Sequence, residues 1–260
     1  MDKNNHFNKI QKITEIIRNS KNMIVLTGAG VSTGSGIPDF RTPGKGLWEK
    51  VNPYEVTSID AFYANPKRFY HFYRPRIEKL NEVASNPSHN AIAKLEEKGY
   101  MKWLITQNID NLHRKAGSKK MIKIHGTLDE AICSKCHSII PSSELLKMLD
   151  SVCGGIPYCE CGGIYKPNVT LFGEMLTNLD EAITISSKAD LMLIVGSSLQ
   201  VSPANLLPQY CVKNGGKLII ANQMPTHLDN FAEINIRDDV CVVLPEIVKL
   251  IDRLDECEVV

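Results

Sequence analysis

Four cysteines near the middle of the chain have the spacing of a structural metal site. They form two close pairs, Cys133-x-x-Cys136 and Cys159-x-Cys161. Thiolates in tight turns converge on one zinc ion because each turn places two sulfurs on the same edge, and two turns complete a tetrahedron. The second pair is one residue shorter than the common C-x-x-C, and Cys153 competes for a ligand position. We therefore predict a small zinc-held module, with four unrelated buried thiols as the alternative.

A glycine-rich turn follows the first predicted strand and forms a second candidate site. It reads Gly28-Ala29-Gly30-Val31-Ser32-Thr33-Gly34 and leads toward a predicted helix start. Backbone N–H groups in such a turn approach a pyrophosphate without obstruction by a Cβ atom, although a tight connection without a ligand looks the same. The third glycine is one place late for the dehydrogenase fingerprint, and no acidic residue ends a second strand about 20 residues on. Hydride transfer is therefore disfavoured.

The segment after this turn ends in a group of residues that suits a lid. Residues 34–41 are rich in glycine at first and finish with Asp39, Phe40 and Arg41. A flexible segment with an aromatic ring and two opposite charges at its end predicts a cover over a bound cofactor. A surface loop with a local ion pair is the alternative interpretation.

Polar side chains follow two predicted strands in the first half of the chain. Residues 107–110 come after the strand 101–106, and His125 ends the strand 121–124. Ligands of open α/β sheets bind at the carboxyl ends of the strands, so these residues predict a binding pocket. Asn108 or Asp110 alternatively caps the next helix, and a histidine at a strand end, taken alone, is more often a hydrogen-bonded structural residue than a base. Its imidazole can accept a proton near neutral pH.

Small residues and an amide follow two strands in the second half. Gly196-Ser197-Ser198 comes after the strand 191–195, and Asn222 comes after the strand 217–221. Such residues can hold the adenosine portion of a nucleotide, although ordinary loop and capping roles explain them equally well.

The elements that must position these residues follow a regular rhythm. Short apolar β-branched runs alternate with amphipathic stretches, which is the pattern of buried parallel strands with crossover helices. The predicted strands are 23–27, 101–106, 121–124, 191–195, 217–221 and 234–236. The predicted helices are 8–19, 88–98, 110–116, 179–187, 203–213 and 244–254, with a short helix at 143–149. We expect an α/β fold, a Rossmann-like parallel sheet with helices on both faces, plus a small zinc-binding domain inserted in the chain.

Composition restricts the class of protein. The chain has 260 residues, 43% of them hydrophobic, and a formal net charge of +1, so no global charge favours nucleic acid or an acidic membrane surface. The N-terminal stretch lacks the apolar core of a secretory signal, and no run is long enough to span a bilayer. Eight cysteines without an export signal suit a reducing compartment. We therefore expect a soluble, cytoplasmic protein that binds neither nucleic acid nor membrane directly.

The motifs occur in an order that resembles the sirtuin family of NAD-dependent protein-lysine deacylases, from about residue 13 to residue 250. The matching segments are Gly28-Ala29-Gly30-Val31-Ser32, Gly36-Ile37-Pro38-Asp39-Phe40-Arg41, Thr106-Gln107-Asn108-Ile109-Asp110, Ile124-His125-Gly126, the cysteine pairs, Phe172-Gly173-Glu174 and Gly196-Ser197-Ser198. One such motif is suggestive, whereas the whole set in register is specific.

The resemblance implies NAD as a co-substrate and zinc as a structural ion. It assigns NAD binding to Gly28, Ala29, Gly30, Thr33, Asp39, Phe40, Arg41, Gln107, Asn108, Ile109, Asp110, His125, Gly196, Ser197, Ser198, Asn222, Gln223 and Cys241. It makes His125 and Asn108 catalytic, and it places an acylated lysine of a partner protein against Tyr73, Arg76, Val169, Phe172, Gly173 and Val201. Zinc falls to Cys133, Cys136, Cys159 and Cys161. Four thiolates leave the zinc no open position for chemistry.

In the implied reaction, the acyl oxygen of a modified lysine attacks the ribose carbon that bears nicotinamide. Phe40 shields the site from water, while Asp39 and Arg41 position the cofactor. His125 acts as general base, directly or through a ribose hydroxyl, so that the 2′ oxygen takes the acyl group. The products are free lysine, nicotinamide and acyl-ADP-ribose.

The acyl preference stays open between acetyl and acidic groups. Sirtuins that remove succinyl or malonyl groups carry a Tyr and an Arg at the spacing of Tyr73-x-x-Arg76. The arginine would pair with the acyl carboxylate and the tyrosine would donate a hydrogen bond. Pro75 between them leaves the local geometry open, and an exposed arginine on a helix turn is the alternative.

The same resemblance divides the chain into parts. The Rossmann-like NAD-binding domain is expected at 1–43, 81–130 and 169–260, the helical and cofactor-loop part of a small domain at 44–80, and the zinc-binding module at 131–168. The aromatic residues of 44–80 predict a helical subdomain with an aromatic core. Two other functions compete: NAD-dependent protein ADP-ribosyltransferase, and a zinc-stabilised binding module without enzymatic activity.

Overall fold

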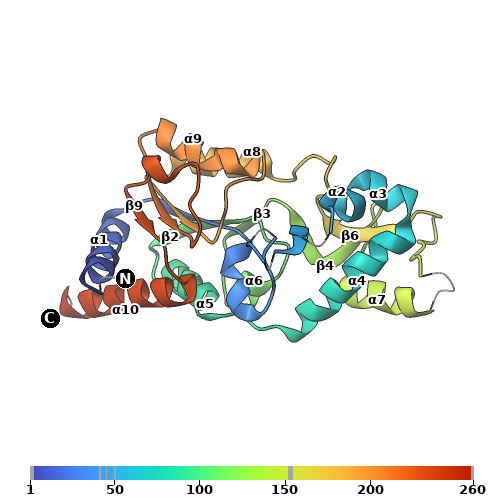
Figure 1. Cartoon of the computed structure of the whole chain (residues 1–260), viewed down its shortest axis with the longest axis horizontal. Coiled ribbons are helices and arrows are strands. Elements are labelled where there is room, and N and C mark those ends of the chain that lie inside the picture. The colour runs from blue at the N-terminus through green and yellow to red at the C-terminus, as the bar shows by residue number, and fades with distance from the viewer. Residues whose placement is uncertain (1–2, 41, 45, 50, 152–154, 259–260) are drawn as a thin grey trace.

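A six-stranded parallel sheet forms the centre of the larger lobe in the computed structural model, which describes residues 3–40, 42–44, 46–49, 51–151 and 155–258 (Figure 1). The strands are β1 (Met23–Thr27), β2 (Met101–Thr106), β3 (Met121–Lys123), β7 (Leu191–Val195), β8 (Lys217–Ala221) and β9 (Ile234–Ile236). They lie in the order β3-β2-β1-β7-β8-β9, and every neighbouring pair is parallel. The predicted Rossmann-like sheet is confirmed, and only Ile124 falls outside its predicted strand.

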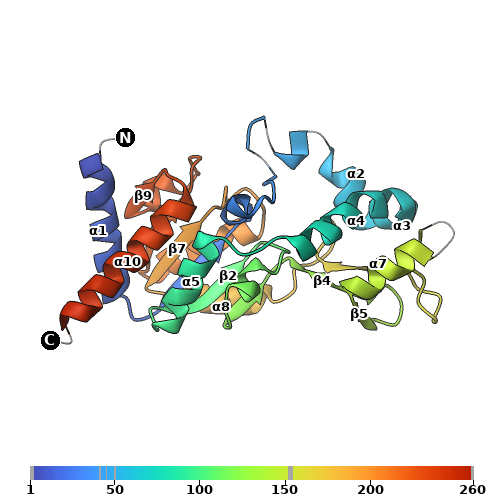
Figure 2. The ribbon, with the colours of Figure 1, turned by 90° about the horizontal axis from the view of Figure 1, so that it is seen from below.

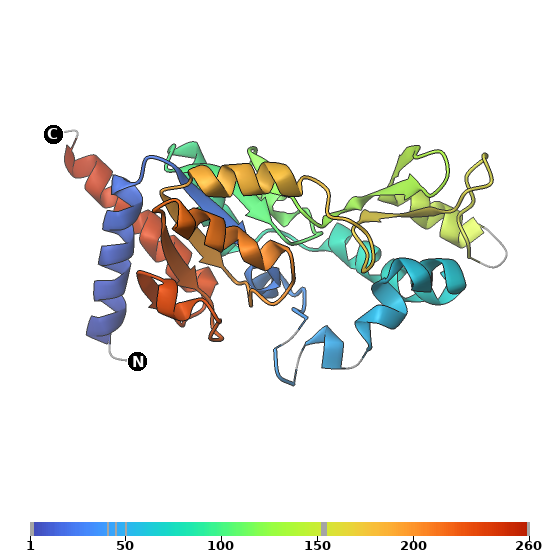
Figure 3. The same cartoon turned by 90° about the horizontal axis from the view of Figure 1, so that it is seen from above.

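Helices cover both faces of this sheet because its strands are apolar on both sides. On β1, Met23 and Val25 pack with α1 (Lys3–Asn19), α5 (Pro87–Glu97) and α10 (Val240–Glu258). Ile24 and Leu26 point to the other face and pack with α8 (Leu179–Lys188) and α9 (Leu207–Lys213). Figure 3 shows the two layers on opposite sides of the sheet.

Several predicted helices differ from the observed ones at their ends. α10 begins at Val240 and not at residue 244, because the Asp239 carboxylate accepts a hydrogen bond from the Cys241 N–H at 2.8 Å and caps the helix before Pro245. The predicted helix 110–116 is reduced to α6 (Leu112–Lys115). A 3-10 turn, η4 (Ala204–Leu206), precedes α9. α1 begins at Lys3, five residues before the predicted start.

A second lobe holds the zinc-binding module and the aromatic helices, and it extends away from the large sheet in Figure 2. Its sheet is antiparallel, with β5 (Ile139–Pro141) and β6 (Tyr165–Val169) on either side of β4 (Gly126–Cys133). Against it lie α4 (Pro66–Glu82) and α7 (Ser142–Ser151), with α2 (Pro53–Thr57) and α3 (Ile59–Ala64) beside α4. These three strands were not predicted. The division of the chain into domains stays a prediction.

The aromatic core predicted for residues 44–80 is present in part. Phe62 and Phe69 are fully buried, with Tyr70 and Tyr73 beside them on α4. Tyr63 is exposed. None of the helices among the described residues is long and apolar enough to cross a membrane.

Candidate active site

A cavity of about 1000 Å³ lies at the carboxyl ends of the central strands and reaches the small lobe. The strand order reverses between β1 and β7, since β2 and β3 lie on one side and β8 and β9 on the other. Connections after β1 and β7 therefore diverge and leave a crevice, which is where open α/β sheets bind their ligands. At least one predicted residue after each of the strands β1, β2, β3, β7 and β8 lines this crevice.

The glycine-rich turn after β1 packs directly against the turn after β7. The Gly30 N–H donates to the Gly196 carbonyl at 2.8 Å, and a Cβ atom on Gly30 would lie 2.8 Å from Gly196 Cα. A Cβ atom on Gly28 would lie 2.9 Å from Ser197 Cα. These glycines thus permit the close approach of two loops as well as access for a ligand. The predicted helix start is wrong, because two short 3-10 turns follow, η1 (Ala29–Val31) and η2 (Thr33–Ser35).

Asn108 has its amide orientation fixed by the protein. Its Nδ2 donates to the Gly28 carbonyl at 3.2 Å and to Ser32 Oγ at 3.1 Å. Both N–H groups are then used, and Oδ1 is left without a partner among the described residues. Asn108 lines the cavity and is 7% exposed, so it presents an acceptor oxygen to a ligand.

Asp110 lies beside Asn108 and is tied to the same loop. Ser32 Oγ donates to Asp110 Oδ2 at 2.8 Å, and the Leu112 N–H donates to Oδ1 at 3.1 Å. Burial raises the pKa of the Asp110 carboxyl, and the hydrogen bonds from Ser32 and Leu112 oppose that rise. This contact explains why α6 begins two residues later than predicted: Asp110 belongs to the site.

His125 stands at the end of β3 with one ring nitrogen engaged and one free. Nδ1 lies 2.8 Å from the Gln107 carbonyl, which accepts, so Nδ1 carries the proton. Nε2 has no partner among the described residues, and His125 lines the cavity. Burial lowers the pKa of His125, and the hydrogen bond to Gln107 opposes the shift. The neutral ring therefore presents a bare nitrogen that can accept a proton.

Gln107 lines the cavity and also connects the two halves of the sheet. Its Nε2 donates to Ser197 Oγ at 2.9 Å. Ser197 is almost fully buried, and Gly196 and Ser198 line the cavity with it.

The segment with Phe40 lies over one side of the cavity. Phe40 stacks on Trp48 with ring centroids 4.9 Å apart, and Trp48 stacks in turn on Phe72. Asp39 lines the cavity, and its carboxylate accepts from the Thr42 N–H at 2.7 Å. Arg41 lies outside the described residues.

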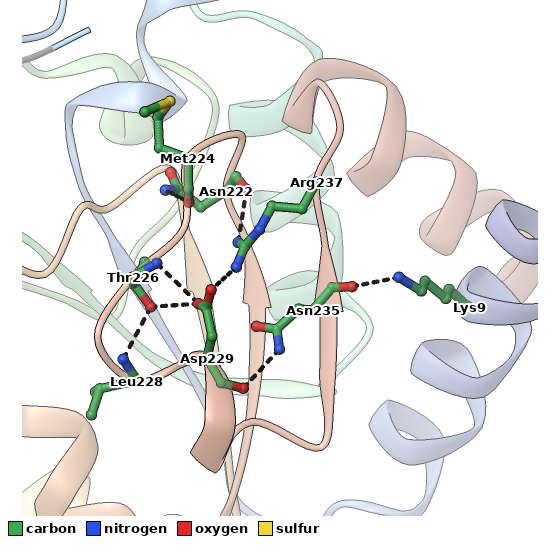
Figure 4. A network of polar contacts seen from close by, with 8 residues as sticks. All are labelled: Lys9, Asn222, Met224, Thr226, Leu228, Asp229, Asn235 and Arg237. Carbon is green, nitrogen blue, oxygen red and sulfur yellow. Dashed lines mark hydrogen bonds and ion pairs between the residues drawn. The ribbon is translucent and has the colours of Figure 1, made fainter. Parts of the chain in front are cut away.

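Asn222 at the end of β8 is held by a polar network around Asp229, shown in Figure 4. Arg237 donates from Nη1 to the Asn222 carbonyl at 3.1 Å and pairs with Asp229 through Nη2. Asn222 Nδ2 donates to the Met224 carbonyl at 2.7 Å. Asn222 and Met224 line the cavity. The network fixes the turn after β8 against the edge of the pocket.

Of the predicted cofactor residues that the structure describes, three do not line the cavity. Thr33 donates from its hydroxyl to the Gly30 carbonyl at 2.9 Å and is exposed. Gln223 points to solvent between two lining residues. Cys241 lies behind the loop, with Sγ 3.3 Å from Ser88 Oγ. Ala29 and Ile109, which were predicted to bind NAD, line the cavity.

Tyr73 and Arg76 on α4 both line the cavity. The Arg76 guanidinium carbon lies 3.4 Å from the centroid of the Phe72 ring, and Nη1 donates to the Phe72 carbonyl. No carboxylate pairs with Arg76 among the described residues, and the Tyr73 hydroxyl has no partner there either. Burial raises the pKa of Tyr73 and lowers that of Arg76. Pro75 is accommodated inside α4.

Val169, Phe172, Gly173 and Val201 also line the cavity, on the side of the small lobe. The main chain of Phe172 is already paired, since it accepts from the Ile59 N–H at 3.0 Å and donates to the Thr57 carbonyl at 2.9 Å. Tyr54 packs on the Phe172 ring at 4.9 Å. A peptide strand in this groove would therefore pair with residues next to Phe172.

The four predicted cysteines converge at one point of the small lobe. Their sulfurs all lie within 4.8 Å of one another, with 3.5 Å between Cys133 and Cys161 and 3.7 Å between Cys136 and Cys159. Tetrahedral zinc with Zn–S bonds of about 2.3 Å needs sulfurs about 3.8 Å apart, so the group fits a zinc ion. His137 is exposed and belongs to no such group, whereas Cys153 lies outside the described residues.

Sequence reasoning missed several residues that build the pocket. Ser32 was noted in a motif but not as a site residue, yet its hydroxyl joins Asn108 to Asp110. Trp48 supports Phe40 and was assigned to the aromatic core alone. His89 and His113 lie behind the pocket, fully and almost fully buried. Among these missed residues, only His113 could have been found from the sequence, because it lies a few residues after the end of a predicted strand.

The chain is similar to proteins of known function. The model of the Sir2 family matches residues 28–203. A relative from Saccharolobus solfataricus, named NAD-dependent protein deacetylase, is 46% identical over 92% of this chain and 96% of its own length. A relative from Archaeoglobus fulgidus, named NAD-dependent protein deacylase 2, is 44% identical over 95% and 97%. A solved Sir2 structure with a deacetylated p53 peptide and 3′-O-acetyl ADP-ribose has a TM-score of 0.88 and 40% identity, and the match covers 93% of this chain and 98% of that one.

Proposed function

This chain belongs to the Sir2 family, and we propose that it is an NAD-dependent protein-lysine deacylase, which transfers an acyl group from a lysine to ADP-ribose and releases nicotinamide. The observation that carries the proposal is the free Nε2 of His125, which faces the same cavity as the acceptor oxygen of Asn108. ADP-ribosyl transfer to protein is not favoured, because the relatives are named deacetylases and deacylases.

The residues around the cavity fit a dinucleotide. Glycines at 28, 30 and 196 keep Cβ atoms out of the loops at the switch point, and Asn108 Oδ1 has no partner in the part of the chain that the structure describes. Bound NAD would supply a ribose carbon made electrophilic by its nicotinamide leaving group.

His125 serves as the general base in this proposal. The Gln107 carbonyl holds the proton on Nδ1, so the ring orientation is set and Nε2 is left to take a proton from a ribose hydroxyl. Asn108 accepts a hydrogen bond from the same part of the ligand through Oδ1. Phe40, supported by Trp48, excludes water from the reacting carbon.

The modified lysine enters from the side of the small lobe. Gly173 and Val201 both line the cavity, and in this proposal the main chains beside them accept the peptide as an added strand. The acylated side chain then passes Val169 and Phe172 toward His125. Zinc holds the small lobe that carries this wall and takes no part in the reaction, since four thiolates complete its coordination.

We further propose that the pocket accepts acidic acyl groups such as succinyl and malonyl beside acetyl. Arg76 lines the cavity without a carboxylate partner among the described residues, and the Tyr73 hydroxyl beside it is free. Burial of the guanidinium favours an anion from the ligand as its partner.

Replacing Arg76→Met keeps an unbranched apolar stem and removes the guanidinium charge. We expect kcat/KM on a succinyl-lysine peptide to fall by about 100-fold, since a charge-assisted bidentate pair contributes about 3 kcal/mol. The rate on an acetyl-lysine peptide should change by less than about threefold. Arg74→Met, on the same helix but paired with Glu78 and Asp150, is the matched control. Equal effects on both peptides would remove Arg76 from acyl recognition.

Nicotinamide release in the presence of NAD and an acyl-lysine peptide tests the function itself. Release must depend on the peptide, and mass spectrometry must show loss of the acyl group from it. A gain of ADP-ribose on the peptide would support transfer instead. His125→Ala should abolish both signals while zinc content stays unchanged.

The location of the protein in the cytoplasm also stays a proposal. It is supported by free thiols gathered at one site, which suits a reducing compartment. Fractionation of the host cell with an antibody against the chain tests it.

A further inference from the structure

A chain of buried polar groups runs behind the cofactor pocket and ends at His113. His113 Nε2 lies 3.0 Å from Thr27 Oγ1, and Thr27 Oγ1 donates to Thr106 Oγ1 at 2.8 Å. Thr106 Oγ1 accepts from the backbone N–H of Asn108 at 3.1 Å. His113, Thr27 and Thr106 are each at most 2% exposed. Apart from Asn108, these groups do not line the cavity.

The directions of these hydrogen bonds define the tautomer of His113. Thr27 gives its only proton to Thr106, so Thr27 Oγ1 can only accept from His113, and the ring proton sits on Nε2. Nδ1 then bears no proton, and this buried atom has no partner among the described residues. Burial lowers the pKa of His113, and the positive charge of Lys123 lowers it further, which keeps the ring neutral.

His89 keeps the His113 ring in place. The two rings meet edge to face with centroids 4.7 Å apart. His89 is fixed in turn by the Asn86 N–H, which donates to Nδ1 at 3.3 Å. Its Nε2 therefore carries the proton of the neutral ring and lies 3.5 Å from Ser32 Oγ, the hydroxyl that receives the Asn108 amide.

An unpartnered buried nitrogen costs free energy, so a residue chosen for packing alone would be apolar here. Histidine supplies one thing that an apolar ring lacks, a donor toward Thr27. We propose that His113 is a positioning residue for the cofactor pocket, whose Nε2–H orients the Thr27 and Thr106 hydroxyls and thereby holds Asn108 in its ligand-binding position. This inference rests on the proposed NAD-dependent deacylation.

The proposal separates two amide replacements of His113. In His113→Gln, the amide reaches the position of Nε2 and retains a donor to Thr27. In His113→Asn, the shorter side chain places its amide only near the position of Nδ1, which has no hydrogen-bond partner among the described residues. Thr27→Val removes the connecting hydroxyl at nearly constant shape. Thr14→Val is the matched control, because Thr14 is equally buried, has an unpartnered hydroxyl and lies on α1 away from the cavity.

The readout is the Kd for NAD by calorimetry, together with KM for NAD and for an acyl-lysine peptide. We expect His113→Asn and Thr27→Val to weaken NAD binding about tenfold, as loss of one buried hydrogen bond implies, with the peptide KM unchanged. The double variant should be no weaker than the weaker single variant. His113→Gln and Thr14→Val should bind NAD within about twofold of the original protein.

An unchanged Kd in both His113→Asn and Thr27→Val, in protein that is folded by circular dichroism, would overturn the proposal. Equal loss in His113→Gln and His113→Asn would also overturn it, since a packing role does not distinguish the two. Failure of the proposed function looks different: the original protein would bind NAD but release no nicotinamide in the presence of the peptide. The Kd comparison still decides the role of His113 in that case.

Discussion

One hydrogen bond decides which nitrogen of His125 takes part in the reaction. With Nδ1–H given to the Gln107 carbonyl, Nε2 is the acceptor, and burial lowers the pKa of the ring below its ordinary value of 6.5. A base whose pKa is lowered stays unprotonated, and therefore active, at pH values where an exposed histidine is already charged.

The acid limb of the pH profile should accordingly have its midpoint below pH 6.5. As pH falls through the pKa of His125, kcat/KM should fall about tenfold per pH unit, because one protonation removes the base. Initial rates of nicotinamide release between pH 4.5 and 8 measure this. His71→Gln, an exposed histidine on α4, should leave the profile unchanged. A midpoint at or above pH 6.5 would contradict the assignment of the buried His125 ring as the base.

At the residue scale, the sequence predicted which side chains line the pocket better than what they contact. Residues 107–110, His125 and Asn222 were found because strand ends are visible as the ends of apolar runs. Their hydrogen-bond partners were not found, because such partners are distant in the sequence. Thr27 and His113, for example, are 86 positions apart and come into contact only when the sheet has formed. Gln107 shows the same limit: it lines the cavity, but its residue type gives no sign that its amide nitrogen donates to Ser197.

Among the elements, the turn after β8 is held by a polar network in addition to the apolar packing of Leu228. Arg237, at the end of β9, connects the Asn222 carbonyl with the Asp229 carboxylate, and Thr226 completes the network (Figure 4). Asp229 has a lowered pKa because Arg237 and Thr226 hydrogen-bond to it, against the effect of burial. The turn is therefore fixed by these polar contacts together with Leu228, which is buried in the core.

We expect Arg237→Met to weaken NAD binding about fivefold, since one hydrogen bond to Asn222 is worth about 1 kcal/mol. The turnover number should stay within about twofold, because no reacting atom is contacted. Calorimetry and initial rates measure the two quantities. Arg253→Met, which changes an exposed arginine on α10, is the control. If the Asn222 side of the pocket does not contact the cofactor, Arg237→Met will bind NAD as the original protein does.

The elements of the large sheet were predictable because their strands are continuous runs of apolar residues. β4 and β6 were missed for the opposite reason. β4 begins at a glycine and contains Asp129 and Glu130, whereas β6 contains Pro167 and Asn168. These strands are stabilised by pairing with each other and by the converging cysteines, which a local pattern does not reveal.

The whole molecule consists of two lobes with the cavity between them, and the thiol cluster lies in the smaller one. The small lobe has a core of its own around Phe62 and Phe69, and the pair of Arg74 and Asp150 joins its helices α4 and α7. Removing the metal should therefore unfold the cysteine-bearing turns and displace the wall near Val169, while the parallel sheet persists.

A strong chelator should remove one zinc ion per chain, lower the melting temperature and abolish deacylation, with NAD binding to the large lobe weakened less than peptide binding. Metal analysis, calorimetry and thermal unfolding measure these effects. Cys136→Ser and Cys159→Ser should lose zinc in the same way, whereas Cys257→Ser, an exposed thiol on α10, should keep it. Full activity in zinc-free protein would contradict the structural role of the thiol cluster.

The contact between the turns after β1 and β7 restricts how this protein can change over generations. A methyl group on Gly196 would lie 2.4 Å from the Val31 nitrogen, and one on Gly30 would meet Gly196 in return. A side chain at either glycine would thus clash with the backbone of the opposite turn. No substitution in that turn can relieve the clash, because the atoms in contact belong to the backbone. Related proteins that keep this contact are expected to differ mainly in the small lobe. A related protein that lacks one of these glycines must have a different arrangement of the two turns.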